Sequence, residues 1–250
     1  MSFLKNAIDV ERGYTNRINC WIYGAPLSGK TTVAATFPKP LIISTDGNVK
    51  HVDPSIPAVR LSSTMNQLTP SGKKMPISGW EYFLGIIKEL SLSNQYETIV
   101  VDLVEDMYEL CRTHWNDAMG IIHESETKQG MGSKTIKTSF FQALSDLQNL
   151  SQNVVLISHA KNDSWGKVEV VRTNIAESIE NKIRGYTDGL LYLHSEVDAE
   201  TGKIVRALVL NSNSPIANTR WDTEVNVTDP SYEGIINAIT NKVKIKKEKK

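Results

Sequence analysis

Residues 20–32 read CWIYGAPLSGKTT, and this stretch decides the fold. Gly24, Gly29, Lys30 and Thr31 fit the spacing G-x-x-x-x-G-K-[ST], which is typical of loops that bind phosphate groups. An apolar run typical of a strand precedes the loop, and a run compatible with a helix follows it. In such a loop the backbone amides form an anion site, to which the following helix adds its positive end. The stretch therefore predicts a nucleotide-binding P-loop.

The chemistry of the loop residues predicts their roles. Gly24 and Gly29 allow backbone conformations and a close approach that a Cβ would obstruct. We expect Lys30 to reach the β and γ phosphates of ATP, and the Thr31 hydroxyl to complete the coordination shell of Mg²⁺. The predicted nucleotide-binding residues are Gly24, Ala25, Pro26, Leu27, Ser28, Gly29, Lys30, Thr31 and Thr32.

A second motif, YETIVVDLVED at residues 96–106, supplies a carboxylate for the metal. Its β-branched centre predicts a buried strand with Asp102 at the carboxyl end, where open α/β sheets bind ligands. We expect Asp102 to orient Mg²⁺ together with Thr31. An aspartate that caps the following helix is the alternative for this position, and the two roles are compatible.

Composition and charge favour one α/β core. The chain has 250 residues, 40% of them hydrophobic, and a formal net charge of zero. Six lysines and one glutamate gather in residues 242–250, so we expect a basic tail there. Two isolated cysteines, Cys20 and Cys111, and the lack of a signal peptide or an apolar membrane span favour a soluble protein of the cytoplasm without membrane contact.

Apolar runs alternate with helical periods along the chain, which predicts a mainly parallel sheet with helices on both faces. The predicted strands are 17–23, 40–44, 97–102, 153–158 and 188–194, and the predicted helices are 79–92, 105–119 and 139–150. Segments 67–79 and 120–137 fit neither period, so we expect mobile loops there. Residues 190–210 are expected to form a β-hairpin around SEVDAETGK.

Hydrolysis of a nucleotide needs a group that orients and deprotonates the attacking water. Three carboxylates compete for this role: Asp46 after the strand PLIIST, and Glu105 and Asp106 shortly after Asp102. Many AAA-type ATPases place a glutamate directly after the metal-binding aspartate, but this chain has Leu103 there. This difference favours Asp46.

Five segments occur in an order that is informative: GAPLSGKTT, LIISTDGN, TIVVDLVEDMYELC, NVVLISHAKN and GLLYLHSEVDAETGKIVRALVLNSNSPIANTR. Over about residues 17–222 the chain resembles the RecA-like recombinase ATPases. It is more closely similar to AAA-type phage nucleotide-binding proteins, a group that includes single-strand annealing proteins. The resemblance implies a RecA-like core at 17–241 with a C-terminal β-hairpin, between an N-terminal segment 1–16 and the Lys-rich tail 242–250.

The resemblance also implies roles for two strand-end residues. It makes Asp46 the water-activating carboxylate and His159 the sensor of the γ phosphate, beside Lys30 and with Glu105 as the competing base. The family usually has glutamate and glutamine at the positions of Asp46 and His159, so slow hydrolysis is expected. Three arginines could act in trans on the nucleotide of a neighbouring subunit: Arg220 as first choice, then Arg206 and Arg184.

In RecA-like proteins two loops contact DNA, and segments 123–138 and 160–174 hold the matching positions here. The candidate nucleic-acid residues are Lys128, Lys134, Lys137, Lys161, Trp165, Lys167 and Arg172. Cations neutralise phosphates and an aromatic ring stacks on unpaired bases, so single-stranded DNA is the expected partner. A solvated loop with Trp165 packed on the body is the alternative. The resemblance implies further partners, namely a single-strand-binding protein and other copies of the chain.

Three functions remain open from the sequence. The preferred one is an ATPase of phage DNA recombination or single-strand annealing, stimulated by DNA. The second is a small-molecule or nucleotide kinase, which shares the P-loop but usually needs an arginine-rich lid. The third is a nucleotide-gated scaffold with negligible hydrolysis, which the aspartate at position 46 favours.

Overall fold

The computed structural model describes residues 17–150, 152–221, 223 and 225–248. The predicted segment 1–16 and the last two residues of the Lys-rich tail lie outside this part. Residues 242–248 of the tail lie in the last helix, α6 (Tyr232–Glu248). Among the helices of the described part, none has the length and apolar character that a membrane span requires.

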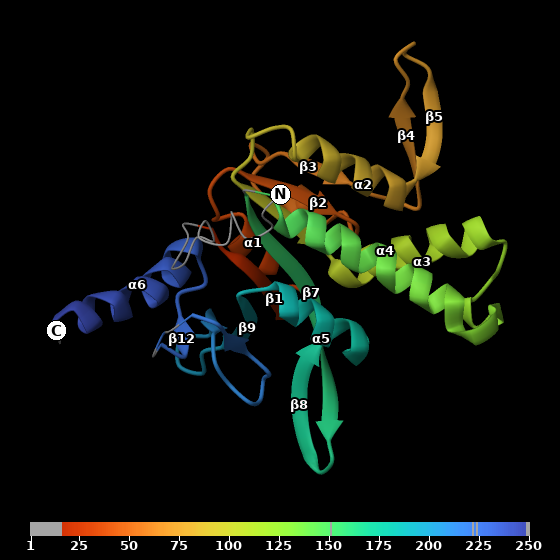
Figure 1. Ribbon diagram of the computed structural model, residues 1–250. Coiled ribbons are helices and arrows are strands. Elements are labelled where there is room, and N and C mark those ends of the chain that lie inside the picture. Colours follow the sequence, from red (N-terminus) through yellow and green to blue (C-terminus); the bar gives the residue numbers. More distant parts are fainter. Residues whose placement is uncertain (1–16, 151, 222, 224, 249–250) are drawn as a thin grey trace, which may run out of the picture.

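The centre of the molecule is a sheet (Figure 1). The order of its strands is β12-β10-β9-β1-β7-β6-β2-β3. The pairs from β9 through β1, β7, β6 and β2 to β3 are parallel. These strands are β1 (Asn19–Gly24), β2 (Pro40–Ser44), β3 (Ala58–Arg60), β6 (Thr98–Asp102), β7 (Asn153–Trp165) and β9 (Gly189–Val197). The central strands are apolar runs buried on both faces, as parallel sheets require. The predicted mainly parallel α/β sheet is confirmed.

Antiparallel strands complete the C-terminal side of the sheet. β10 (Ile204–Val209) folds back on β9, which confirms the predicted C-terminal hairpin. Two short strands, β11 (Asn218–Thr219) and β12 (Val227–Thr228), pair with β9 and β10 respectively.

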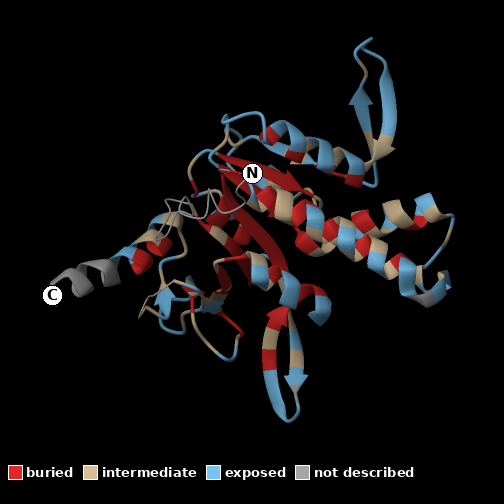
Figure 2. Cartoon of the chain, viewed as in Figure 1, coloured by how far each residue is buried: buried red, intermediate tan, exposed pale blue. Residues whose placement is uncertain are grey.

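Helices cover both faces of the sheet and create two separate cores (Figure 2). Alternate residues of β1 point to opposite faces, so Trp21 and Tyr23 enter one core while Cys20 and Ile22 enter the other. The larger core lies under α2 (Gly79–Leu90), α3 (Val104–Met119), α4 (Met131–Gln148) and α5 (Glu177–Tyr186). The smaller core is covered by α1 (Lys30–Ala34) and α6.

The expectation of a mobile loop at 67–79 is wrong. β4 (Thr64–Leu68) and β5 (Lys74–Ser78) form an antiparallel hairpin that stands away from the body (Figure 1). Of the residues that suggested a loop, Pro70, Ser71 and Gly72 lie in its turn, where the Gly72 amide donates to the Thr69 carbonyl. Pro76 and Ser78 belong to β5, and Gly79 begins α2. Most of the hairpin is exposed on both sides, so its sequence shows no alternation of apolar and polar residues.

The expectation of a mobile loop at 120–137 is also wrong. Two 3-10 turns, η2 (Glu124–Glu126) and η3 (Lys128–Gly130), lead directly into α4, which begins at Met131 rather than at residue 139. Gly130 adopts a left-handed conformation with φ 70° at the helix start. Ile136 and Phe140 lie on the buried face. Of the polar residues between them Thr138 is exposed, while the Ser139 hydroxyl accepts a hydrogen bond from Nε1 of Trp80 at 3.1 Å.

The second expected DNA loop, 160–174, is a β-hairpin. β7 continues beyond the predicted end at residue 158 and pairs with β8 (Val168–Thr173). This hairpin projects from the end of the sheet, with its turn at the far tip (Figure 1).

Candidate functional site

The P-loop connects β1 to α1 at the carboxyl end of the parallel strands. Gly24 ends β1 between its neighbours β7 and β9, and a Cβ there would lie 2.7 Å from the carbonyl oxygen of Leu193. Gly29 precedes α1 with φ 99°, a conformation that L side chains rarely adopt. Both glycines are therefore required by the backbone path, as predicted.

Lys30 is the first residue of α1, and its side chain turns back over the loop. Its ammonium group donates to the carbonyl oxygens of Gly24 at 3.1 Å and Ala25 at 2.8 Å. Lys30 is only 6% exposed, and this burial lowers the pKa of its ammonium group. The first amides of α1 have no acceptor within the helix, so the loop presents N–H donors beside a cation, which suits a phosphate.

Thr31 and Asp102 meet beside the loop. The Thr31 hydroxyl donates to Oδ2 of Asp102 at 2.7 Å. Asp102 ends β6 and is 1% exposed, and burial raises the pKa of its carboxyl group to about 6. A hydroxyl and a carboxylate are hard oxygen ligands, and Mg²⁺ usually takes only one or two protein carboxylates together with phosphate oxygens. In the described part of the chain, no group of three His, Cys, Asp or Glu side chains could hold a metal without such help. The residues therefore fit Mg²⁺ bound together with a nucleotide.

His159 lies where β7 passes the P-loop, paired in register with Gly24. Its backbone N–H donates to Oε1 of Glu105 at 2.8 Å, and its Nδ1 lies 3.2 Å from the same oxygen. Glu105 comes from the first turn of α3, and burial raises the pKa of its carboxyl group. Glu105 thus holds His159 in place at the edge of the site.

Asp46 follows β2 and precedes the turn η1 (Asn48–His51). Its carboxylate accepts hydrogen bonds from the Asn48 backbone at 2.9 Å, the Ser44 hydroxyl at 3.1 Å and the Asn48 side-chain amide. These three donors fix the orientation of the carboxylate.

A cavity of about 420 Å³ brings these groups together. Its size suits a small-molecule site. Of the predicted site residues it is lined by Leu27, Gly29, Lys30, Thr31, Thr32, Asp46, Asp102, His159 and Arg206. Glu105, which accepts from the His159 backbone, does not line this cavity. Asn48, His51 and Val52 also line the cavity and were not predicted, although the Asp-Gly turn at 46–47 could have indicated that the chain bends back there.

Of the three arginine candidates, only Arg206 lines this cavity. Its Nε donates to the carbonyl oxygen of Ser28 at 2.8 Å within the same chain. Arg220 donates to the Gly185 carbonyl, and Arg184 binds the side chain of Asn218. A role of any of them in trans stays a prediction.

The predicted nucleic-acid residues divide into two groups. Lys128 lies on η3, and Lys134 and Lys137 lie on α4, where Lys137 donates to Ser178 at 3.3 Å. Lys161 and Lys167 lie on the β7–β8 hairpin. The side chain of Trp165 lies outside the described part of the structure.

Arg172, predicted as an exposed loop cation, is placed differently. It is 4% exposed, and its guanidinium binds Glu180, which is fully buried, at 3.0 Å. Because β8 points this side chain inward, its charge pairs with a carboxylate inside the protein. The expectation that Arg172 contacts nucleic acid is therefore wrong.

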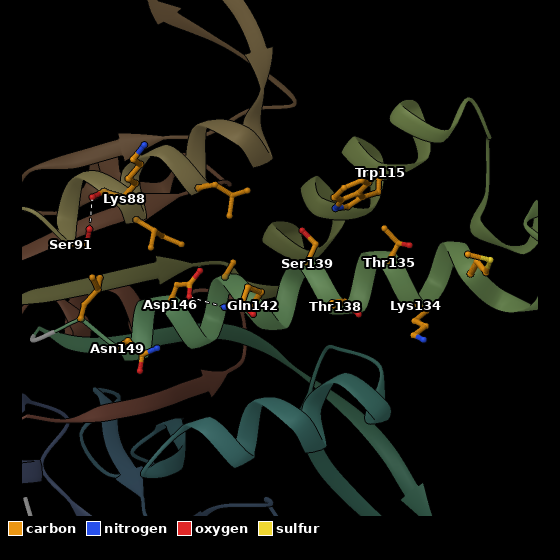
Figure 3. A pocket seen from close by; sticks show the side chains of 15 residues that line it. Lys88, Ser91, Trp115, Lys134, Thr135, Thr138, Ser139, Gln142, Asp146 and Asn149 are labelled. Carbon is orange, nitrogen blue, oxygen red and sulfur yellow. Dashed lines mark hydrogen bonds between the residues drawn. The ribbon is translucent and has the colours of Figure 1, made fainter. Parts of the chain in front are cut away.

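A second and larger cavity, of about 1260 Å³, lies between α2 and α4 (Figure 3). Trp115 of α3 also lines it, while Lys88, Gln142 and Asp146 are among its polar residues. It contains none of the P-loop residues. Of the two cavities, only the smaller one is therefore lined by predicted phosphate-binding and catalytic residues.

The fold and the site together define a P-loop protein with a mainly parallel α/β core. A family of AAA domains matches residues 16–221, and the chain belongs to this family. The match confirms the predicted kinship with AAA-type P-loop proteins.

Two comparisons with individual proteins accompany this match. The chain is similar to the SPbeta prophage-derived uncharacterized protein YorG of Bacillus subtilis strain 168, with 24% identity over 211 residues. The alignment covers 80% of this chain and 58% of YorG, so the chain spans little more than half of that relative. The KaiC-like protein PH0186 of Pyrococcus horikoshii OT3 superposes with a TM-score of 0.43 and 12% identity, covering 80% of this chain and 81% of that one.

Proposed function

We propose that the chain binds Mg·ATP in the cavity at the P-loop and hydrolyses it slowly. The observation that carries this proposal is the 2.7 Å hydrogen bond from Thr31 to Asp102, beside the buried ammonium group of Lys30. It places two oxygen ligands and one cation at the start of α1, where N–H groups are free to receive phosphate oxygens. When bound, Mg²⁺ would neutralise charge that develops on the phosphates.

The residues around the cavity suggest a division of labour. Lys30 and the amides of α1 bind the phosphates. Asp46 accepts a proton from water as the water oxygen attacks the γ phosphorus, and the bond from this phosphorus to the β–γ bridging oxygen breaks. ADP and inorganic phosphate are the products. His159, held by Glu105, donates a hydrogen bond to the γ phosphate.

A nucleotide-gated scaffold is a second candidate, and one observation favours it. The carboxylate of Asp46 already accepts three hydrogen bonds, from Ser44 and twice from Asn48. These bonds occupy most of the acceptor positions of the carboxylate, which would otherwise be open to a water molecule. Turnover could then be negligible while nucleotide binding persists.

We further propose that the ATPase acts in phage DNA recombination or single-strand annealing, as an oligomer that binds single-stranded DNA. The prophage origin in the name of YorG supports the phage setting. The projecting β7–β8 hairpin carries Lys161 and Lys167, and η3 and α4 carry Lys128 and Lys134. Lysines on projecting elements can neutralise DNA phosphates without moving the core.

Phosphate release from ATP, measured with and without single-stranded DNA, tests the proposal. We expect slow release by the wild type that DNA stimulates, loss of release in Asp46→Asn with ATP binding retained, and a smaller loss in Glu105→Gln. Asp117→Asn, an exposed site on α3, is the matched control. Tight binding with no release would favour the scaffold, and no binding of ATP would refute both candidates.

Separate variants test the proposed binding of single-stranded DNA. Lys128→Glu combined with Lys167→Glu should weaken DNA binding and remove stimulation, while release without DNA stays unchanged. Lys74→Glu on β5 combined with Lys88→Glu on α2 introduces the same charge change elsewhere and should have no effect. Equal DNA binding by the double variant and the control would contradict the assignment of this surface.

A further inference from the structure

Arg206 lies directly on the P-loop of its own chain. Besides the hydrogen bond from its Nε to Ser28, its side chain packs against Gly29, where a Cβ would lie 3.2 Å from Nε and 3.8 Å from Cζ. The sheet sets this position, because Arg206 pairs with Ser195 of β9 and β9 pairs with β1, the strand that leads into the loop. The contact therefore depends on the central sheet and not on a mobile segment.

Within the described residues, Arg206 forms no ion pair with a carboxylate. By contrast, Arg172 and Arg184 both lie within 4.0 Å of Glu180. A guanidinium has five N–H donors, and the bond to Ser28 uses one of them. Arg206 thus brings a cation with spare donors to the cavity that also holds Lys30.

We propose that Arg206 binds the terminal phosphates of the nucleotide in cis, while its Nε remains on the Ser28 carbonyl. This inference rests on the proposed function, because it requires a nucleotide in the P-loop. Guanidinium groups form paired, charge-assisted hydrogen bonds with phosphate oxygens, and the bond to Ser28 orients the group in advance. The role differs from a trans-acting finger, since one chain supplies both the loop and the arginine.

Equilibrium binding of Mg·ATP tests the phosphate contact, at a protein concentration where light scattering shows single chains. Arg206→Ala should weaken ATP binding by about 10- to 100-fold, the range for a lost charge-assisted contact. Arg206→Lys should recover part of the affinity, because lysine keeps the positive charge but lacks the paired N–H donors of a guanidinium group. Lys203→Ala, which removes an exposed cation from the same hairpin, should bind like the wild type. Arg206→Ala binding as tightly as the wild type would overturn the inference.

Mixing two variants separates cis from trans. Arg206→Ala retains the P-loop lysine, and Lys30→Met retains the arginine. If Arg206 acts in cis, an equal mixture releases no more phosphate than the two proteins measured alone. Recovery above that sum would place the arginine in trans and overturn the inference. If the wild type itself binds no ATP, the proposed function fails instead, so the two failures are distinguishable.

Discussion

The hydroxyl of Thr31 and the carboxylate of Asp102 are joined by a 2.7 Å hydrogen bond, although the two residues are 71 positions apart in the sequence. Thr31 is held by the first turn of α1, and Asp102 by the end of β6. Two strands, β1 and β6, flank β7 and deliver both oxygens to the same edge of the sheet. The fold itself thus brings a hydroxyl and a carboxylate oxygen together, and both are ligand types that Mg²⁺ prefers.

The buried charge of Asp102 should reduce the stability of the protein without ligands. Burial raises the pKa of this carboxyl group from 3.8 to about 6, so the folded state disfavours the charged form at pH 7.5. Asp102→Asn keeps an oxygen that accepts from Thr31 and should raise the free energy of unfolding by about 1–3 kcal/mol. Urea denaturation at pH 7.5 without metal or nucleotide measures this difference.

The difference for Asp102→Asn should shrink as the pH falls toward 4, since the wild-type carboxyl group then gains its proton in the folded state. Asp117→Asn, at an exposed site, should show no such gain. A less stable Asp102→Asn protein at pH 7.5 would show that the charge is balanced within the fold.

Gly24 should not tolerate a larger side chain. A Cβ would lie 2.7 Å from the backbone oxygen of Leu193, and the β1–β9 pairing fixes both residues. Gly24→Ala should lower the free energy of unfolding by about 1–3 kcal/mol, as overpacking does. The matched control is Gly85→Ala in α2, where the added Cβ meets no atom within 4 Å and should raise stability by up to about 1 kcal/mol. Equal denaturation midpoints for Gly24→Ala and the wild type would contradict the close approach.

Arg172 should act in stability and not in DNA binding. Its guanidinium pairs with Glu180, which also accepts from the Thr173 hydroxyl at 2.8 Å. Arg172→Ala leaves Glu180 buried without its main partner and should cost about 3–5 kcal/mol in thermal or chemical denaturation. Replacing both residues by methionine should recover most of the loss, because no buried charge remains.

Arg112→Ala is the control for Arg172→Ala. Arg112 pairs with Glu109 at 2.6 Å on the surface, where an ion pair contributes at most about 1 kcal/mol. If Arg172→Ala cost no more than Arg112→Ala, the buried pair would not anchor the β7–β8 hairpin.

The parts of the fold that the sequence predicted have a strong local cause. β2 and β6 are β-branched runs bounded by turns, and their observed ends agree closely with the predicted ones. The β4–β5 hairpin was missed because both of its sides are largely exposed and its residues therefore lack the alternation on which strand prediction depends. The start of α4 was missed because its exposed lysines conceal the spacing of Ile136 and Phe140.

The site shows the same division. Lys30, Thr31 and Asp102 belong to short sequence motifs that predict phosphate and metal binding. The structure brings these three residues together in one cavity. The contact of Arg206 with Ser28 joins residues 178 positions apart and depends on the register between β10 and β9. No local pattern sets that register, so the sequence could name Arg206 as a candidate but could not choose it over Arg220.

The central claim is that a buried ammonium group and the N–H groups of α1 bind the phosphates of ATP. Titration calorimetry of the wild type, Lys30→Met and Lys88→Met with ATP, with and without Mg²⁺, tests it most directly. We predict Mg²⁺-dependent binding by the wild type and Lys88→Met, and at least about tenfold weaker binding by Lys30→Met, since a charge-assisted contact is lost. Equal affinities for all three proteins would contradict the claim.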